Sequence, residues 1–386
     1  MAEKTNRDIA LFLERKLNNR REEENYRQLK MEEQLIDFTS NDYLGLAHSQ
    51  ELADLIEKNY RAISPKLNGS TGSRLLSGNS QQAVQLEARL AKIFQAPSAL
   101  LFNSGYVANL ALLSSIPRKG DTIIYDQLSH TCIKEGARLS FAKRISFKHN
   151  DLKDLKNKFK KAEGRIYVAI ESVYSMDGDF SPLSEIIKLC KEHGAAIFLD
   201  EAHSTGTWGK MGNGLVCSLG QENEIFACIY TFGKGMGVHG ACVVGSESLI
   251  DYLINFARPF IYTTALPLHN IISIDSSFNF LSNHQYLQDR LRKNIDLFNT
   301  LYSEQNLKQS KFNKIASQSA IQAIICPGNW RVKKIASDLR SKGFDVRPIL
   351  SPTVKQGSER LRICLHTFNS DQEIESLVES LIQANR

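Results

Sequence analysis

Tyr230-Thr231-Phe232-Gly233-Lys234-Gly235-Met236-Gly237 is the segment around which the predicted architecture is arranged. It follows an apolar run at residues 225–229, which the sequence predicts as a buried strand. Glycine on both sides of Lys234 lets the backbone turn sharply and lets a bulky group approach closely. A lysine at such a turn is either a solvated loop charge or a reactive amine. The residues that the fold places near it decide between the two.

Short apolar runs alternate with helical patterns on both sides of this segment. Further strands are predicted at residues 99–102, 122–125, 165–172, 195–199 and 241–245, and helices at 8–30, 49–62, 81–94, 107–114 and 183–192. Such alternation is typical of an α/β fold with a mostly parallel sheet, in which ligands bind beyond the carboxyl ends of the strands. Polar residues gather at those predicted ends: Ser104, His130, Ser175, Asp200, His203, Thr231 and Lys234.

The pattern changes after about residue 268. A long helix at 270–306, broken near Asn283, precedes strands at 319–326 and 360–365 and helices at 332–342 and 371–384. This pattern predicts a smaller α+β domain, to which a short strand at 36–40 is added. The expected organisation is therefore an N-terminal segment, 1–46, joined to the small domain, a large domain, 47–268, and the small C-terminal domain, 269–386.

Composition sets broad limits on the class of protein. The 386 residues are 42% hydrophobic and 23% charged, which is ordinary for a globular chain long enough for two domains. No apolar run is long enough to span a bilayer, and the N-terminus lacks a secretory h-region, so we expect no membrane partner and a cytoplasmic location.

The net charge of +6 is mild and spread along the chain. Its densest basic segment, residues 143–165, has apolar residues at helical spacing, which favours a solvated helix face over a nucleic-acid site. A modestly positive surface suits an anionic cofactor or an acidic carrier. The seven cysteines form no CxxC pair, which argues against a disulfide framework or a zinc site and predicts buried free thiols.

Two kinds of site explain the polar residues poorly. A hydrolase triad built on Ser175 or Ser204 needs a G-x-S-x-G nucleophile elbow, and the sequence contains none. A metal site would use Asp200, Glu201, His203 and His130, but Asp-x-x-His is a common pattern and no further ligand has a suggestive spacing. No metal is therefore predicted.

A pyridoxal phosphate site explains them better. This cofactor needs a lysine for a Schiff base, a carboxylate beside its pyridine nitrogen and a cradle for its phosphate. Lys234 and Asp200 supply the first two, and the predicted strand–Ser104-Gly105–helix turn supplies backbone N–H groups for the third. Arg74, inside the glycine-rich loop at 68–78, is a further candidate anion site.

With these motifs in view, the chain resembles the α-oxoamine synthases, which are fold-type I pyridoxal phosphate enzymes. The resemblance extends from Asn41-Asp42-Tyr43-Leu44-Gly45-Leu46 to Arg360-Leu361-Arg362. It implies a homodimer that joins an amino acid to an acyl thioester with loss of CO2. Three stretches resemble the branch that uses L-alanine and a pimeloyl thioester of coenzyme A or acyl carrier protein, a step in biotin biosynthesis: residues 72–78, 231–235 and 256–267.

The family pattern implies a role for each matching residue. The residues implied to be catalytic are Lys234, His130, Asp200 and His203. Lys234 would bind the cofactor covalently and later move the α-proton of the amino acid. The remaining cofactor contacts would come from Gly105, Tyr106, Ser175 and Thr231, with Thr264 reaching the phosphate of the neighbouring subunit. The residues implied to contact substrate are Arg27, Asn41, Glu171, Thr353 and Arg362.

The chain departs from the family pattern at positions that touch acyl-substrate recognition, and Ala83 stands where a histidine is common. An arginine usually precedes the Pro-Pro-Thr-Val stretch, where this chain has Leu350 and Ser351. Either Arg347 replaces it from nearby or the contact is lost. Branches that use glycine with an acetyl thioester, or serine with a palmitoyl thioester, are the alternatives, although their lysine motifs usually lack Gly-Lys-Gly-x-Gly. A non-catalytic subunit of a heteromeric synthase is disfavoured, because such subunits lack the lysine.

Overall fold

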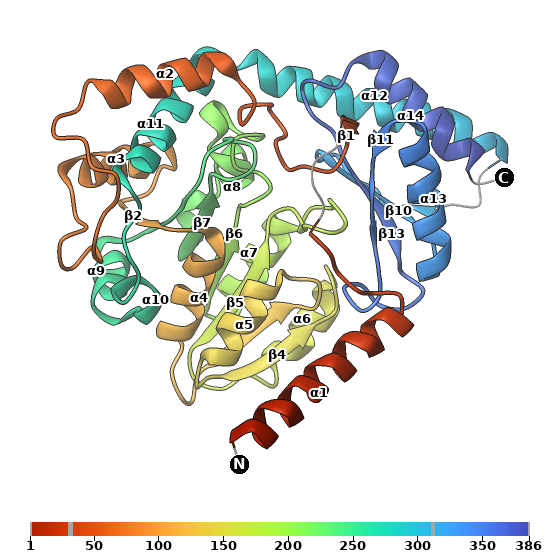
Figure 1. Ribbon diagram of the computed structural model, residues 1–386. Coiled ribbons are helices and arrows are strands. Elements are labelled where there is room, and N and C mark those ends of the chain that lie inside the picture. The colour runs from red at the N-terminus through yellow and green to blue at the C-terminus, as the bar shows by residue number, and fades with distance from the viewer. Residues whose placement is uncertain (1, 30–33, 310–312, 385–386) are drawn as a thin grey trace.

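The computed structural model describes residues 2–29, 34–309 and 313–384. Figure 1 shows a large sheet surrounded by helices and, beside it, a smaller sheet near the C-terminus. Within the described residues, no helix combines the length and apolar character needed to cross a membrane. All seven cysteines are buried free thiols, as the sequence predicts.

The large sheet has seven strands in the order β2-β8-β7-β6-β5-β3-β4. β8 runs opposite to the other six strands of this sheet, so the prediction of a mostly parallel α/β sheet is confirmed. The strands are β2 (Ser98–Phe102), β3 (Thr122–Asp126), β4 (Lys143–Phe147), β5 (Ile166–Glu171), β6 (Ala195–Asp200), β7 (Ala227–Thr231) and β8 (Ala241–Gly245).

Both faces of this sheet are buried. Successive side chains of a strand point to opposite faces, so each strand contributes residues to both. In β6, Ile197 and Leu199 belong to one apolar cluster and Phe198 to the other. The helices that accompany the sheet are α2 (Gln50–Arg61), α3 (Gln81–Ile93), α4 (Gly105–Ser115), α5 (Thr131–Leu139), α6 (Leu152–Phe159), α7 (Leu183–Glu192), α8 (Gly214–Ser218), α9 (Glu247–Phe256) and α10 (Arg258–Ile261).

The smaller sheet is antiparallel, in the order β12-β13-β10-β9. Its strands are β9 (Asn313–Lys314), β10 (Ile321–Ile325), β12 (Arg347–Ile349) and β13 (Arg360–Cys364). The associated helices are α11 (Leu268–Asn283), α12 (Tyr286–Gln309), α13 (Asn329–Ser341) and α14 (Asp371–Gln383). The gap between α11 and α12 confirms the predicted break. The N-terminal strand β1 (Ile36–Asp37) pairs in parallel with β11 (Phe344–Asp345). The domain boundaries stay predictions.

Three predicted elements differ from the structure. Strand β7 lies two residues later than predicted. The basic segment at 143–165, predicted as a solvated helix face, begins with β4, an edge strand with mostly exposed or half-buried side chains. Helix α1 (Ala2–Glu22) projects from the body in Figure 1 and ends well before the predicted residue 30, which lies outside the described residues. Glu24 has a φ of 55°, a left-handed conformation that an α-helix does not contain.

Candidate active site

The carboxyl ends of three neighbouring strands meet at one edge of the large sheet. Strands β5, β6 and β7 end at Glu171, Asp200 and Thr231, and Glu171 and Asp200 are directly paired across β5 and β6. Lys234 follows β7 by three residues, and His203 follows β6 by three. Parallel pairing therefore brings together polar residues that lie far apart in the sequence.

A chain of hydrogen bonds runs from Lys234 to Arg362 on the smaller sheet. Lys234 Nζ lies 3.0 Å from His203 Nε2, and His203 Nδ1 lies 2.7 Å from the Tyr43 hydroxyl. Tyr43 donates to Asn41 Oδ1 at 3.0 Å, and Arg362 Nη2 donates to the same oxygen at 2.9 Å. Because the only Tyr43 proton goes to Asn41, His203 donates from Nδ1 and keeps its Nε2 lone pair for the lysine.

Burial lowers the pKa of the lysine and of the histidine in this hydrogen-bond network. It lowers the pKa of Lys234, against the opposing charges of Asp200 and Glu171. It also lowers the pKa of His203 far below its ordinary value, and the cations Lys234 and Arg362 add to that effect. The result is a neutral imidazole beside an amine that loses its proton more easily than an exposed lysine does.

Asp200 is held in place from two directions. Its Oδ2 accepts a hydrogen bond from Asn109 Nδ2 at 2.7 Å, and its Oδ1 accepts one from the Ala202 backbone N–H at 2.9 Å. Asn109 lies on α4 and also donates to the Gly105 carbonyl at 3.0 Å. The carboxylate is therefore fixed relative to the N-terminus of α4.

Glu171 is a second buried acid in the site. Its carboxylate accepts a hydrogen bond from the His130 backbone N–H, at the residue that caps α5. Burial, together with the nearby charge of Asp200, raises the pKa of Glu171 to about 8. His130 Nδ1 accepts from the Cys132 backbone N–H at 3.3 Å and lies 2.9 Å from Cys132 Sγ. Burial and the charge of Lys234 lower the pKa of His130.

Helix α4 begins at Gly105 and points its N-terminal N–H groups, including that of Tyr106, out of the helix. A Cβ atom on Gly105 would collide with Cγ2 of Thr231, so only glycine allows the helix to approach the end of β7 this closely. The first turn of α4, which is the predicted phosphate site, therefore lies next to Thr231, whose hydroxyl is a further predicted phosphate contact.

Two more predicted residues lie near this edge. Ser175 is buried in the segment after β5, and its carbonyl accepts from Arg362 Nε at 2.7 Å. Thr264 is exposed, and its carbonyl accepts from Asn103 Nδ2 at 2.9 Å. Asn103 lies just before the α4 N-cap, so Thr264 is tied to the cradle by its backbone.

Arg27 and Thr353 are exposed and contact each other, with Arg27 Nη2 3.5 Å from Thr353 Oγ1. They are 326 residues apart in the sequence and are brought together by the fold, while their role at the substrate stays a prediction. Arg347 instead directs its guanidinium at Asp345, with contacts of 2.8 and 3.0 Å.

Arg74 is not the anion site that the glycine-rich loop suggested. Its guanidinium forms a bidentate ion pair with Glu87, at 2.8 and 2.9 Å, and a third hydrogen bond with Asn79 at 2.9 Å. Both charged side chains are largely buried, so the pair holds the loop against α3.

Glu201 points away from the candidate site. It is fully buried and accepts hydrogen bonds from the backbone N–H groups of Leu215 and Val216, each at 2.8 Å, and from the Ser204 hydroxyl. Burial raises the pKa of Glu201 to about 7. It therefore does not join Asp200 and His203 in a metal site, and Ser204 has a structural partner in place of a triad.

Sequence reasoning missed two side chains that organise the site. Tyr43 belongs to the Asn41–Leu46 stretch but has no predicted role, and nothing in the sequence singles out Asn109 by itself. Both act on partners far along the chain, Tyr43 on His203 and Asn109 on Asp200. Asn109 lies on the same face of α4 as Gly105, four residues earlier, and this spacing is the one local signal that could have found it.

Comparisons with known proteins agree with this geometry. The model of the aminotransferase class I and II family matches residues 33–381. An 8-amino-7-oxononanoate synthase from Emericella nidulans is 39% identical over 369 residues, covering 90% of this chain and 88% of the relative. The synthase of the same name from Saccharophagus degradans is 34% identical over 355 residues, covering 92% of this chain and 87% of the relative.

Solved structures show the same architecture. A crystal structure of 8-amino-7-oxononanoate synthase from Francisella tularensis has a TM-score of 0.76 and 29% identity, covering 90% of this chain and 97% of that one. A serine palmitoyltransferase from S. paucimobilis, with bound PLP–myriocin aldimine, has a TM-score of 0.84 and 26% identity, covering 91% and 87%. By its sequence and its fold, this chain belongs to the aminotransferase class I and II family.

Proposed function

We propose that this protein condenses L-alanine with a pimeloyl thioester to give 8-amino-7-oxononanoate, CO2 and the free carrier, with pyridoxal phosphate as cofactor. The observation that carries the proposal is the meeting of Lys234, His203 and Asp200 at neighbouring strand ends beside the α4 N-terminus. Relatives at 33–39% identity that are named for this activity supply the substrate pair.

The side chains present fit this cofactor. Gly105 leaves space at a helix N-terminus, where N–H groups can hold a phosphate, and Asp200 is a fixed carboxylate suited to a pyridine nitrogen. Lys234 would attach the cofactor. The other proposed contacts are His130 on the ring face, His203 at the ring hydroxyl, and Tyr106, Ser175, Thr231 and the partner subunit's Thr264 around the phosphate.

Bound in this site, pyridoxal phosphate supplies an electron sink for the charge that develops on the amino acid. The protein's own task is to orient the substrate and move protons. Arg362 would hold the alanine carboxylate, since a guanidinium presents several donors in one plane. Asn41 and the Ser175 carbonyl already fix the orientation of Arg362.

Lys234 would take the α-proton of alanine, because burial has lowered its pKa and increased its neutral fraction. The α-carbon then forms a bond to the thioester carbonyl carbon, and the carrier leaves as a thiolate that takes a proton from solvent. The alanine carboxylate departs as CO2, and the α-carbon regains a proton from Lys234. Glu171, Arg27 and Thr353 are proposed to line the substrate path.

Several details go beyond this core. We propose a homodimer, because the family pattern places Thr264 at a neighbouring subunit's phosphate and because Thr264 is exposed here. A cytoplasmic location is consistent with seven free thiols, which suit a reducing compartment. The proposed domain limits stay at 1–46, 47–268 and 269–386, and either coenzyme A or acyl carrier protein is proposed as the carrier.

The test is to supply the purified protein and pyridoxal phosphate with pimeloyl-coenzyme A and L-alanine, glycine or L-serine. We expect CO2 and 8-amino-7-oxononanoate with alanine, detected by mass spectrometry. Lys234→Ala should abolish the product and let gel filtration remove the cofactor. Lys188→Ala, an exposed lysine on α7, is the matched control. Parallel reactions contain acetyl-coenzyme A or palmitoyl-coenzyme A in place of pimeloyl-coenzyme A. Product only from glycine with the acetyl thioester, or from serine with the palmitoyl thioester, would contradict the proposal.

A further inference from the structure

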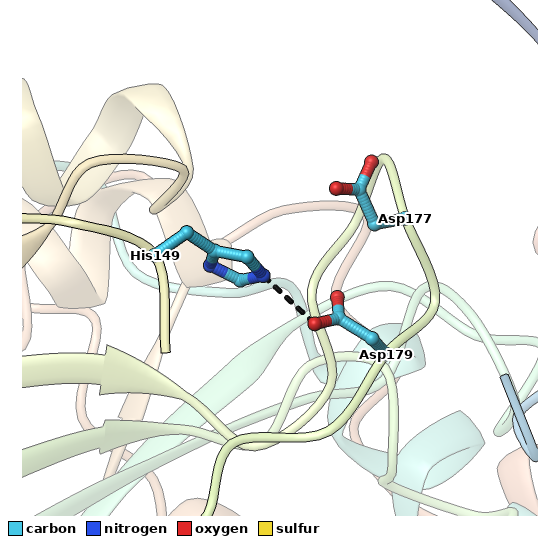
Figure 2. Close-up of side chains that lie close together, drawn as sticks. All are labelled: His149, Asp177 and Asp179. Atoms are coloured by element: carbon cyan, nitrogen blue, oxygen red, sulfur yellow. Dashed lines mark hydrogen bonds and ion pairs between the residues drawn. The ribbon is translucent and has the colours of Figure 1, made fainter. Parts of the chain in front are cut away.

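A further histidine, His149, lies near the same edge of the large sheet, between two carboxylates. His149 follows β4, Asp126 ends β3, and Asp179 lies in the segment after β5. His149 Nδ1 lies 3.0 Å from Asp126 Oδ1, and His149 Nε2 lies 2.7 Å from Asp179 Oδ2. Figure 2 shows the ring directed at Asp179, with Asp177 close by. The histidine thus connects the carboxyl end of β3 with the segments that follow β4 and β5.

The geometry requires His149 to be protonated. A neutral imidazole has one N–H and would turn a lone pair toward one of the two carboxylates, whereas an imidazolium donates to both. Burial lowers the pKa of His149, but the hydrogen bonds and charges of Asp126 and Asp179 outweigh it and raise the pKa to about 9. The Tyr174 ring stands edge-on to the imidazole, 4.5 Å away.

This arrangement is an ion-pair cluster and not a metal site. His149, Asp177 and Asp179 offer ligand atoms within 4.8 Å of one another. However, both ring nitrogens of His149 already face carboxylates, and a protonated imidazole has no lone pair for a metal. Asp177 is paired with Arg360 of β13, so its charge is also balanced.

The segment that His149 holds connects the large sheet to the smaller one. Besides the Asp177–Arg360 pair, the Ser175 carbonyl accepts from Arg362 of β13. The Gly178 carbonyl accepts from the hydroxyls of Ser317 and Ser319, each at 2.8 Å. Gly178 has a φ of 73°, and a Cβ there would collide with the Ile321 carbonyl, so this contact with β10 is close.

We propose that His149 is a positioning residue: its bridge from Asp126 to Asp179 fixes segment 175–179, and that segment sets the place of Arg362. The inference rests on the proposed function, in which Arg362 holds the amino-acid carboxylate. The charged groups around the imidazole are Asp126, Asp177, Asp179 and Arg360. Asp126 is itself fixed by the backbone N–H groups of Leu128, at 2.8 Å, and Asn150, at 2.9 Å.

The first test separates substrate binding from chemistry in the holoenzyme. His149→Gln keeps polar atoms but removes the charge, and Asp179→Asn removes the opposite charge. Each is expected to raise the KM for L-alanine roughly ten- to hundredfold, the value of a charge-assisted hydrogen bond, with kcat changed less than about threefold. His193→Gln is the matched control, since that ring stacks on Phe159 and faces a backbone carbonyl.

The double variant tests whether the two residues act through one ion pair. If they do, His149→Gln with Asp179→Asn raises the alanine KM about as much as the worse single variant. Effects that multiply, or an alanine KM within about threefold of wild type in either single variant, would overturn the proposal.

A second measurement needs no catalytic activity. Hydrogen–deuterium exchange of peptides covering residues 172–181 and 360–364 should be faster in His149→Gln than in wild type, with or without cofactor and substrate. Unchanged exchange in a peptide covering β2 shows that the variant is folded. Unchanged exchange in all three peptides would refute the positioning role of His149, whether or not the proposed reaction is correct. Faster exchange in an inactive protein would support the positioning role and refute only the reaction.

Discussion

His203 and His149 follow two strands of one sheet, and burial opposes the charged form of each ring. Yet the pKa of His203 is lowered, whereas the pKa of His149 is raised to about 9. Burial, reinforced by the charges of Lys234 and Arg362, keeps the imidazole of His203 neutral. Carboxylates face both nitrogens of His149, so its imidazole is charged. Neighbouring charge therefore adds to the effect of burial at His203 and outweighs it at His149.

The difference assigns the two residues to different tasks. A neutral imidazole whose Nε2 lone pair faces an amine can take part in proton movement. An imidazolium clamped by two acids has no acceptor and no free donor, so it can only hold its neighbours in place. We expect substitutions at His203 to affect the chemical step and substitutions at His149 to affect geometry.

The largest expected effect comes from His203→Asn. Removing the imidazole beside Lys234 should lower kcat by roughly 10²- to 10⁴-fold, the usual range for a group engaged in proton transfer. The measurement is steady-state turnover of alanine and pimeloyl-coenzyme A, with His193→Asn as the control. A kcat within about threefold of wild type would show that the contact with Lys234 is not used in turnover.

A smaller effect than that of His203→Asn is expected from Tyr43→Phe. The hydroxyl that receives the Nδ1 proton of His203 is lost, so the tautomer is no longer fixed. We expect about a tenfold loss of kcat/KM, the value of one buried hydrogen bond, with the cofactor still bound. Tyr252→Phe removes a hydroxyl bonded to the Ser115 carbonyl, at 2.9 Å, and serves as a control that should keep full activity.

The pH dependence of stability should distinguish the two histidines by sign. His149 has a raised pKa, so its contribution is complete below its ordinary value of 6.5 and is lost as pH rises through about 9. His203 has a lowered pKa, so its contribution is complete above 6.5 and is lost as pH falls.

Urea unfolding from pH 5 to pH 10 gives the measurement. The difference between wild type and His149→Gln should shrink by about 3 kcal/mol at most between pH 6.5 and 9. The difference between wild type and His203→Asn should instead shrink toward acid. If the stability differences for the two variants depended on pH in the same direction, the opposite charge states of the two histidines would be contradicted.

The smallest effect is expected from Arg347→Ala. This substitution removes an ion pair that lies outside both histidine networks. Arg347 directs both arms of its guanidinium at Asp345, and the pair is partly exposed. The thioester KM should change by less than about twofold, and stability by about 1 kcal/mol or less. A tenfold rise in that KM would mean that Arg347 leaves Asp345 to replace the family arginine that this chain lacks.

Much of the fold could be predicted because buried parallel strands are apolar runs. The runs that end at Glu171 and Asp200 are continuous, so their ends and the polar residues beyond them follow directly. Strand β4 lacks this signal, because an edge strand has fewer neighbours and carries lysine and arginine. Apolar residues 225–226 precede β7 and displaced its predicted start by two residues.

The candidate site was only partly predictable for a different reason. Lys234 has glycine on both sides, which is a local pattern, and Asp200 follows a strand. Tyr43, Asn109 and His149 act through partners that are brought close only by the completed fold. Arg74 shows the converse, since its sequence surroundings suggest an anion site but α3 supplies Glu87 as its partner.

The seven buried thiols give this protein an internal reporter of unfolding. Each is at most 9% exposed, so a thiol reagent can react with it only after the surrounding structure opens. Cys326 and Cys364 lie in or beside the smaller sheet, and Cys228 and Cys242 lie in the larger one. The order of labelling, read by peptide mass spectrometry, therefore reveals which sheet opens first without any chromophore.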